Sequence, residues 1–526
     1  MSASAAALIL PMPLKYATVD GRYRFSKRSD AFTLLEDHPI ADSLRIWHYR
    51  LRRVNKHERH IPASQMQLDA TKEIYAANRI PDVVLRSVFK YLHPLDLIHG
   101  CSKVCQRWNF LIRAPSLYRE VRVVVTSESF RNGSVRRFLE MVRTQVRKLC
   151  VVHSSSFMPL NELYTIFPVC MPNVVLLDLG SFDDLPRELI EKLVSCFPNV
   201  ETLNIATVAR SKAKQEQLST LFVDAAFPRL RRLVIGYVDA MDMQTAHALL
   251  SWKRQLEVLV FRNAISPRLR HVETMPFSTT LKELHLELVR DVDIATIYNF
   301  KNLVTLSLGC CWQMRDEHLI HLKEQYKLEH LHFSTLGEGV STVGLASFLH
   351  LPEHNAEYCF PHRLKYLRLS YSEQFNNEAV KELLKSCPDL ESLNVAGDAA
   401  LDDEALSLLI ANLRKLRFLD ISNVCNGERK LNALQDLAGD ELPYLRLLQV
   451  HYNDQIAETT LQALNVRRPS MLISPRRDYL INWSIVEGRV VFSKHFKGDL
   501  NAVINDLNDE PGFCCIDDHS SLCGQG

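Results

Sequence analysis

The sequence of 526 residues predicts an α/β fold, in which a block of three short helices precedes a curved repeat solenoid. The solenoid is expected to have parallel strands on its concave side and helices on its convex side. Two observations lead to this prediction. Between residues 121 and 475 a motif of the form L-x-x-L-x-L, with aliphatic substitutions, recurs about twelve times, mostly at intervals of roughly 25 to 30 residues. The segments between the motifs have the spacing of amphipathic helices instead.

The composition is that of an ordinary soluble globular protein, with 47% hydrophobic and 24% charged residues. A net charge of +2 gives no electrostatic reason to expect nucleic acid as the main partner. The sequence contains no run of ~18 apolar residues, so it predicts no membrane span. The apolar run at the N-terminus is not preceded by the basic residues of a signal peptide, so none is expected. The 13 cysteines lack the paired spacing of small secreted domains, so we expect reduced thiols in the cytoplasm, the nucleus or both.

Residues 1–78 are predicted to be an irregular N-terminal extension that becomes basic toward its end. The stretch "IADSLRIWHYRLRRVNKHERH" contains six arginines and lysines. It is open to interpretation as a nuclear localisation patch, a lipid-facing helix or a nucleic-acid-binding segment. The plainest interpretation is a solvated helix that docks through Ile46, Trp47 and Leu51.

Residues 79–120 predict the helical block. Pro81 and Pro94 stand where the first turn of a helix tolerates a missing N–H group. A segment of ~40 residues rarely folds alone, so its apolar surface should pack on the solenoid, on a partner protein or on both. The two apolar stripes at helical spacing comprise Leu85, Val88, Phe89 and Leu92, and then Val104, Trp108, Leu111 and Ile112.

This helical block resembles an F-box, whose pattern combines Leu-Pro, a helix, Asp-Leu after a proline turn and Val-Cys-x-x-Trp. It departs from the family at Ile80, where leucine is usual, and at Tyr118, where tryptophan is common. The resemblance implies binding to a Skp-type adaptor and, through it, to a cullin and its RING protein. The alternative is a helical cap for the repeats without a partner. The positions that match the pattern, and are therefore the predicted adaptor contacts, are Ile80, Pro81, Leu85, Val88, Phe89, Leu92, Leu97, Val104, Cys105 and Trp108.

In each repeat the L-x-L alternation places two aliphatic side chains on one face of a short strand. A helix is expected to follow, as in "NNEAVKELLKSCPDL", where Val380, Leu383 and Leu384 share a face, Asn377 is placed to cap and Pro388 ends the helix. One unit cannot bury its leucines alone, so neighbouring units must stack. The interval before "LKYLRL" is longer, and its insertion near residues 354–362 is able to reach over the concave face.

The repeats resemble leucine-rich repeats, in particular the cysteine-containing subtype. In "LVTLSLGCCWQMRDEHLIHL" Cys311 follows the leucines at the family's spacing, and in "LESLNVAGDAALDDEALSLL" Asp398 takes that position. An F-box ahead of such repeats resembles the substrate receptors of SCF ubiquitin ligases. The resemblance implies a non-catalytic chain that presents a protein substrate for ubiquitination and proteasomal degradation. The alternative is a non-degradative interaction scaffold that uses the solenoid alone.

Strand positions that alternate with the core leucines should face the concave side, and the central units are richest there in side chains typical of selective interfaces. The alternative is an ordinary solvated strand surface. The predicted substrate contacts are Arg262, Glu283, His285, Glu287, His330, His332, Tyr366 and Arg368.

We expect no catalytic residue, cofactor or metal. The chain has no Gly-rich phosphate loop, no H-E-x-x-H and no G-x-S-x-G. Cys101 with Cys105, and Cys310 with Cys311, fit the apolar frames and are predicted to be core.

Residues 476–526 are not repeat-like. "YLINWSIVEGRVVFSKHF" predicts a hairpin that turns at Glu487-Gly488 and caps the open end of the solenoid, and an acidic, disordered tail is expected to follow. The spacing of Cys514, Cys515, His519 and Cys523 in this tail is not typical of a zinc site.

Overall fold

The computed structural model describes most of the chain between residues 80 and 474, and four short strands outside it. The chain divides into two compact units: unit 1 comprises residues 1–158, 165–174 and 498–514, and unit 2 comprises residues 159–164, 175–497 and 515–526. The described residues are 16–19, 22–25, 80–89, 92, 97–98, 100–153, 160–180, 182, 185–205, 219–236, 247–249, 251–265, 277–288, 297, 299–311, 313–323, 325, 327–351, 360–424, 432–438, 441–453, 456–468, 471–474, 481–486 and 489–494.

Unit 1 contains the helical block. Its described elements are α3 (Asp82–Phe89), the short 3-10 helix η1 (Cys101–Lys103), α5 (Gln106–Leu111) and the 3-10 helix η2 (Pro115–Leu117). The rings of Phe89 and Trp108 meet edge to face with centroids 5.0 Å apart. Arg107 ties α5 to the start of α3 through hydrogen bonds to the Asp82 carboxylate and the Ile80 carbonyl. The apolar stripes thus form an internal core for the block.

The helical block continues directly into the first strands of unit 1. β3 (Glu120–Val125) pairs in parallel with β4 (Lys148–His153), and α6 (Ser127–Arg131) and α7 (Ser134–Val142) lie between them in the chain. The Tyr118 ring packs against Phe138 of α7 at a centroid distance of 6.1 Å. The block therefore covers the first repeat whether or not it also binds a partner. β3 is not among the predicted motifs, because "EVRVVV" lacks the leucine frame.

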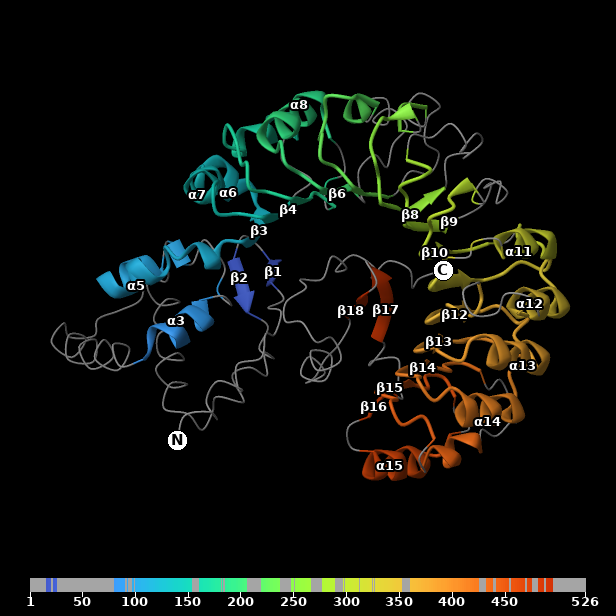
Figure 1. The fold of residues 1–526 in the computed structure, drawn as a ribbon. Coiled ribbons are helices and arrows are strands. Elements are labelled where there is room, and N and C mark those ends of the chain that lie inside the picture. The colour runs from blue at the N-terminus through green and yellow to red at the C-terminus, as the bar shows by residue number, and fades with distance from the viewer. Residues whose placement is uncertain are drawn as a thin grey trace. The chain divides into compact units, whose positions relative to one another are not determined.

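Unit 2 is a stack of parallel strands. Consecutive strands from β5 to β16 pair in chain order. In Figure 1 these strands line the inner side of the arc of unit 2 and its helices form the outer side. The strands are β5 (Leu176–Asp178), β6 (Thr202–Ile205), β7 (Arg232–Gly236), β8 (Val258–Ile265), β9 (Glu283–Leu288), β10 (Thr305–Leu308), β11 (His330–Ser334), β12 (Tyr366–Ser370), β13 (Ser392–Asn394), β14 (Phe418–Asp420), β15 (Leu447–Gln449) and β16 (Leu472–Ser474).

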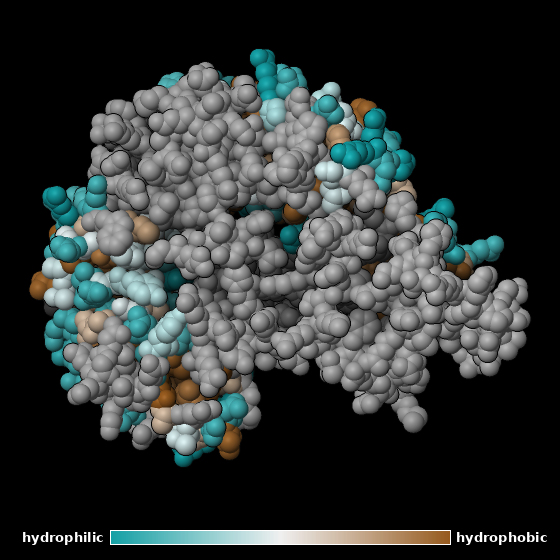
Figure 2. Space-filling view, turned by 180° about the vertical axis from the view of Figure 1, so that it is seen from behind, coloured by the Kyte–Doolittle hydropathy of each residue, from teal (hydrophilic) through white to brown (hydrophobic). Residues whose placement is uncertain are grey.

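Helices lie between many of these strands in the described part of the chain. Each predicted motif begins one of the strands β4 to β15, so the predicted α/β repeat solenoid is confirmed. In Figure 2 the described residues on the outer surface are mainly hydrophilic, as the convex side of a solenoid requires. The helices are η3 (Leu160–Ile166), α8 (Arg187–Cys196), η4 (Ser219–Phe222), α11 (Asp316–Leu322), α12 (Thr342–Leu349), α13 (Asn377–Ser386), α14 (Asp403–Asn412), η7 (Ala433–Ala438) and α15 (Glu458–Arg467).

The frame leucines of the repeats are interior, as in Leu303, Leu306 and Leu308, which are all fully buried. The predicted cap of α13 is wrong by one residue. The side chain of Asn376, not of Asn377, accepts the Ala379 N–H at 3.1 Å, because Asn376 has the extended backbone that a capping residue needs.

A second hydrogen-bond ladder continues beyond the strands. The Tyr371 N–H donates to the Ala396 carbonyl and the Gly397 N–H to the Ser422 carbonyl, both at 2.7 Å. Gly397 is required here, because its φ is +77° and the Tyr371 ring occupies the space that a Cβ would need. The residues at this loop position with positive φ are Cys310, Thr335, Tyr371, Gly397, Asn423 and Tyr452.

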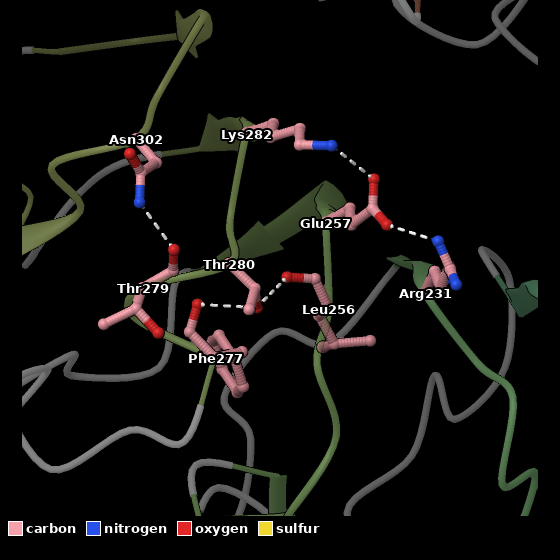
Figure 3. A network of polar contacts seen from close by, with 8 residues as sticks. All are labelled: Arg231, Leu256, Glu257, Phe277, Thr279, Thr280, Lys282 and Asn302. Carbon is pink, nitrogen blue, oxygen red and sulfur yellow. Dashed lines mark hydrogen bonds and ion pairs between the residues drawn. The ribbon is translucent and has the colours of Figure 1, made fainter.

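Charged side chains clamp neighbouring repeats at the position just before each strand. Glu257 lies between Arg231 and Lys282, at 2.9 and 2.8 Å, and the hydrogen bond from Lys282 is the largest cause that lowers the pKa of this carboxyl (Figure 3). Beneath it Thr280 Oγ1 donates to the Leu256 carbonyl at 2.7 Å, and Asn302 Nδ2 to that of Thr279 at 2.6 Å. From β6 to β14 the charges at this position are Glu201, Arg231, Glu257 and Lys282, then, after Val304, Glu329, Lys365, Glu391 and Arg417, and Arg446 follows before β15.

Both ends of the chain contain a described hairpin. β17 (Ile481–Val486) pairs with β18 (Arg489–Lys494) in an antiparallel hairpin whose last pair is Val486 with Arg489, which confirms the predicted turn. That it caps the solenoid stays a prediction. β1 (Tyr16–Val19) and β2 (Arg22–Phe25) form a hairpin where the sequence predicted irregular structure, and the Asp20-Gly21 turn signal between them was overlooked.

Some predictions fall outside the described residues. These are the basic stretch near residues 40–60, residues 354–359 of the insertion and the cysteines of the tail. Among the described helices, none is long and apolar enough to cross a membrane.

Candidate functional site

Several of the predicted adaptor contacts are interior residues of the helical block. Leu85, Phe89, Leu97 and Trp108 are between 0% and 6% exposed. These side chains hold the helical block together. Substituting them would therefore affect the binding of a partner by disrupting the fold of the block. Of the other predicted positions, Pro81 is exposed, and the partly exposed ones are Ile80, Val88, Leu92, Val104 and Cys105.

Two apolar side chains of the helical block face outward instead. Val83 on α3 and Phe110 on α5 are each 70% exposed. Neither is among the predicted contacts, because both residues lie off the two apolar stripes that form the core of the block. The helical spacing that predicts the two buried stripes also predicts that an apolar residue on the opposite side of the helix is exposed, as Val83 and Phe110 are.

The second candidate site is the inner face of β9 to β12, where strand pairing aligns two rows of side chains. One row is Glu283, Thr305, His330 and Tyr366, and the other is His285, Ser307, His332 and Arg368. Six of the eight predicted substrate contacts thus come together. The backbones of Arg262 and Glu287 lie in β8 and β9, and their side chains are outside the described part of the chain.

Hydroxyl groups on β10 orient both histidines of β11. His330 Nδ1 lies 3.0 Å from Thr305 Oγ1, and His332 Nδ1 lies 2.8 Å from Ser307 Oγ. The His330 ring also meets Tyr366 edge to face, with centroids 4.7 Å apart and an interplanar angle of 89°. The site is therefore preorganised by one strand-to-strand register.

Burial keeps these histidines neutral at pH 7. It is the largest cause that lowers the pKa of His330 to about 4 and the pKa of His332 well below its usual value. Burial is also the largest cause that raises the pKa of Tyr366 to about 12. Groups in these protonation states serve as hydrogen-bond donors and acceptors, as expected of a binding surface.

Two hollows accompany these rows. A pocket of about 40 Å³ is lined by residues of both rows, among them His285, His332 and Arg368. A larger hollow of about 420 Å³ lies at the starts of the strands, where charged residues such as Lys282, Glu329 and Lys365 line it. The small pocket offers specific polar contacts, and the larger hollow offers charges of both signs.

Two of the four cysteines predicted to be core, Cys101 and Cys311, are buried, whereas Cys105 and Cys310 are only half-buried. Cys101 and Cys311 are at most 1% exposed, and burial raises the pKa of the Cys311 thiol. Within the described ranges no three His, Cys, Asp or Glu side chains gather in a way that could hold a metal ion. Cys311 and Asp398 occupy buried positions of the same frame, and the cysteine-containing subtype stays a prediction.

Comparison with known protein families identifies one domain in the described chain. A family model described as F-box-like matches residues 77–123. No curated protein matches the chain. Among solved structures, a chain in the crystal structure of the Rad7 and Elc1 complex in yeast is similar at 17% identity, over 79% of this chain and 98% of that one, with a TM-score of 0.48. The leucine-rich repeat-containing protein LegL7 from Legionella pneumophila is similar at 14% identity, over 68% of this chain and 97% of its own, with a TM-score of 0.30.

Proposed function

We propose that this chain, which carries an F-box-like domain ahead of a leucine-rich repeat solenoid, is the substrate-recognition subunit of an SCF-type ubiquitin ligase. The match of residues 77–123 to the F-box-like family is the observation on which the proposal depends. In this proposal the F-box-like domain binds a Skp-type adaptor, and through it the cullin and RING protein. The bound substrate is ubiquitinated and then degraded by the proteasome, in the cytoplasm, the nucleus or both.

The mechanism is proximity. The chain performs no chemistry itself, and it holds a substrate lysine near the loaded thioester of a ubiquitin-conjugating enzyme at a raised effective concentration. The inner face of β9 to β12 is the proposed substrate site, because polar side chains from neighbouring strands are fixed there by the register. The exposed Val83 and Phe110 are the proposed adaptor contacts, since apolar side chains at an interface contribute most when they become desolvated.

The test is co-purification of the full chain with a Skp-type adaptor and cullin. We expect wild type to recover a stable complex, and the double variant Val83→Asp, Phe110→Asp to lose about tenfold or more in adaptor affinity. Val343→Asp is the matched control, because Val343 on α12 is 72% exposed and lies far along the chain from the F-box-like domain. Leu85→Asp is a less informative variant, because it places a charge in the core.

A second candidate function is a non-degradative interaction scaffold. The contact between Tyr118 and Phe138 favours it, because it shows the helical block packed on the first repeat as a cap would be. If folded wild type recovers no adaptor, the SCF proposal is wrong and the scaffold explanation takes its place. Recovery of the adaptor by the double variant at wild-type affinity would instead move the contact away from Val83 and Phe110.

A further inference from the structure

Arg368 on β12 has a cationic head group with few partners. Its Nε donates to Ser370 Oγ at 3.2 Å, and no carboxylate of the described residues forms an ion pair with it. Asp420 is the carboxylate whose charge acts on it, but the oxygens of Asp420 accept hydrogen bonds from Asn394 Nδ2 and the Ser422 N–H. Arg368 is half-buried, and burial is the largest cause that lowers its pKa.

His332 provides a second open group beside Arg368. Its Nε2 is buried and has no hydrogen-bond partner, while Nδ1 faces the Ser307 hydroxyl at 2.8 Å. The Ser307 hydroxyl satisfies its own proton by donating it to Nδ1, which places the single ring proton of the neutral imidazole on Nε2. The opposite tautomer would leave Nε2 as a buried acceptor without a partner, so we assign the proton to Nε2. Nε2–H is thus an unused donor.

The pocket that contains these two groups has the sign and the size for an anion. Its lining includes three histidines and Arg368 but neither aspartate nor glutamate. Glu283, the acid nearest in the register, contacts His285 at 3.7 Å. A free volume of about 40 Å³ holds a few water-sized groups, which corresponds to a single head group and not to a whole residue.

We propose that this pocket binds an anionic head group, a carboxylate or a phosphate, on a side chain of the protein substrate. The Arg368 guanidinium offers a two-pronged contact to such a group, and the His332 Nε2–H adds a third donor. The inference rests on the proposed function, in which the inner face of β9 to β12 holds the substrate. It names the chemical feature that a substrate must carry there.

The experiment is calorimetric titration of the full-length chain with small probes. The probes are the N-methylamides of N-acetyl-O-phosphoserine, of N-acetylaspartate and, as the uncharged reference, of N-acetylserine. We expect at least one acidic probe to bind wild type, and to bind Arg368→Gln about tenfold more weakly or worse. Arg414→Gln is the matched control, since Arg414 is exposed outside the pocket, and it should bind as wild type does.

The two acidic probes distinguish the sources of the anion. Preference for the phosphoserine derivative assigns the pocket to a modified substrate, and preference for the aspartate derivative assigns it to an unmodified acidic segment. If neither binds wild type more tightly than the uncharged probe does, or if Arg368→Gln binds them unchanged, the inference is wrong.

Thermal unfolding separates a binding role of Arg368 from a structural one. Because Arg368 is half-buried and forms no ion pair with a described residue, Arg368→Gln should unfold at about the wild-type temperature or above it. A clear drop would show that Arg368 supports the fold and would overturn the inference. Adaptor recovery is independent of this test: Arg368→Gln should co-purify with the adaptor as wild type does. Failure of wild type to recover the adaptor would reject the proposed function without affecting anion binding.

Discussion

Two neighbouring regions on the inner face of unit 2 differ in how their polar side chains are hydrogen-bonded. On β10 to β12 the row of Ser307, His332 and Arg368 leaves donors open, as described above. On β13 and β14 the same row continues with Asn394 and Asp420, which bond to each other at 2.8 Å.

In the second region the side-chain oxygens of Asn394 and Asp420 are hydrogen-bonded, although the hydroxyl of Ser392 on β13 is buried without a partner. Asn394 Oδ1 accepts the Ala396 N–H, and Asp420 Oδ1 accepts the Ser422 N–H, both at 3.0 Å. Buried polar groups that satisfy one another stabilise a fold, while groups left open cost stability and are kept for a ligand. The difference marks β10 to β12 as the region for recognition and β13 to β14 as its support.

The two regions should also respond to pH in opposite directions, and the largest effect is expected at Asp398. Burial raises the pKa of this carboxyl from 3.8 to about 7. Between these values the folded chain holds a proton that the unfolded chain has released, so the free energy of unfolding falls as pH rises, by up to about 4 kcal/mol. Asp398→Asn removes this dependence, and urea unfolding from pH 4 to 8 measures it.

The variant is therefore expected to be more stable than wild type at pH 8 and less so at pH 4. The loss at low pH is about 1 kcal/mol, because one of the bonds from the Phe375 and Ala400 N–H groups is replaced by a poor contact with the amide. Parallel profiles for the two proteins would show that Asp398 is ionised in the fold throughout this range.

His330 in the central region should act in the opposite direction. Its pKa is lowered from 6.5 to about 4, chiefly by burial, so between these values the unfolded chain binds a proton that the folded chain does not. The free energy of unfolding therefore rises with pH across this window, by up to about 3 kcal/mol. His330→Asn keeps an amide near Thr305 and removes the titration.

The measured quantity is the difference in unfolding free energy between wild type and His330→Asn as a function of pH. It should grow from pH 4 to 6.5 and stay constant above. His247→Asn, at an exposed histidine, is measured in parallel as the control. A constant difference over the whole range would contradict the lowered pKa.

The smallest expected change in the free energy of unfolding is that of Asn394→Ala. This variant tests whether Asn394 has a structural role where Arg368 has a binding role. Asn394→Ala removes the partner of a buried carboxylate and should lower the free energy of unfolding by about 2 kcal/mol. It should leave the affinity for the acidic probes unchanged. Urea unfolding at pH 7 and the same calorimetric titration give both quantities, and weaker probe binding by this variant would show that the two regions are not separate.

The sequence contains most of this arrangement, because the side-chain period of a strand is two. Once Leu331 and Phe333 are assigned to the core, His330 and His332 must face the other side, and the equal frames align them with Tyr366 and Arg368. The sequence could not reveal that His332 Nε2 stays unpartnered while Asn394 finds Asp420. That outcome depends on side-chain directions across three strands.

The errors have equally local causes. The two asparagines before α13 have the same chemistry, and only the backbone angle of Asn376 decides which of them caps. β3 consists largely of valine and lacks the leucine frame that identified the other strands. Val83 and Phe110 were passed over because apolar residues were assumed to be core, whereas a surface needs them for a partner.

The alternating charges before the strands impose a rule of parity on the length of the solenoid. From Glu201 to Lys282, and again from Glu329 to Arg417, negative and positive residues take turns, and Val304 separates the two blocks. Deleting one repeat inside a block would bring two like charges next to each other, whereas deleting two would preserve the alternation. Inside these two blocks repeats can therefore be removed in pairs without bringing like charges together, whereas beyond them Arg446 already follows Arg417 with the same charge.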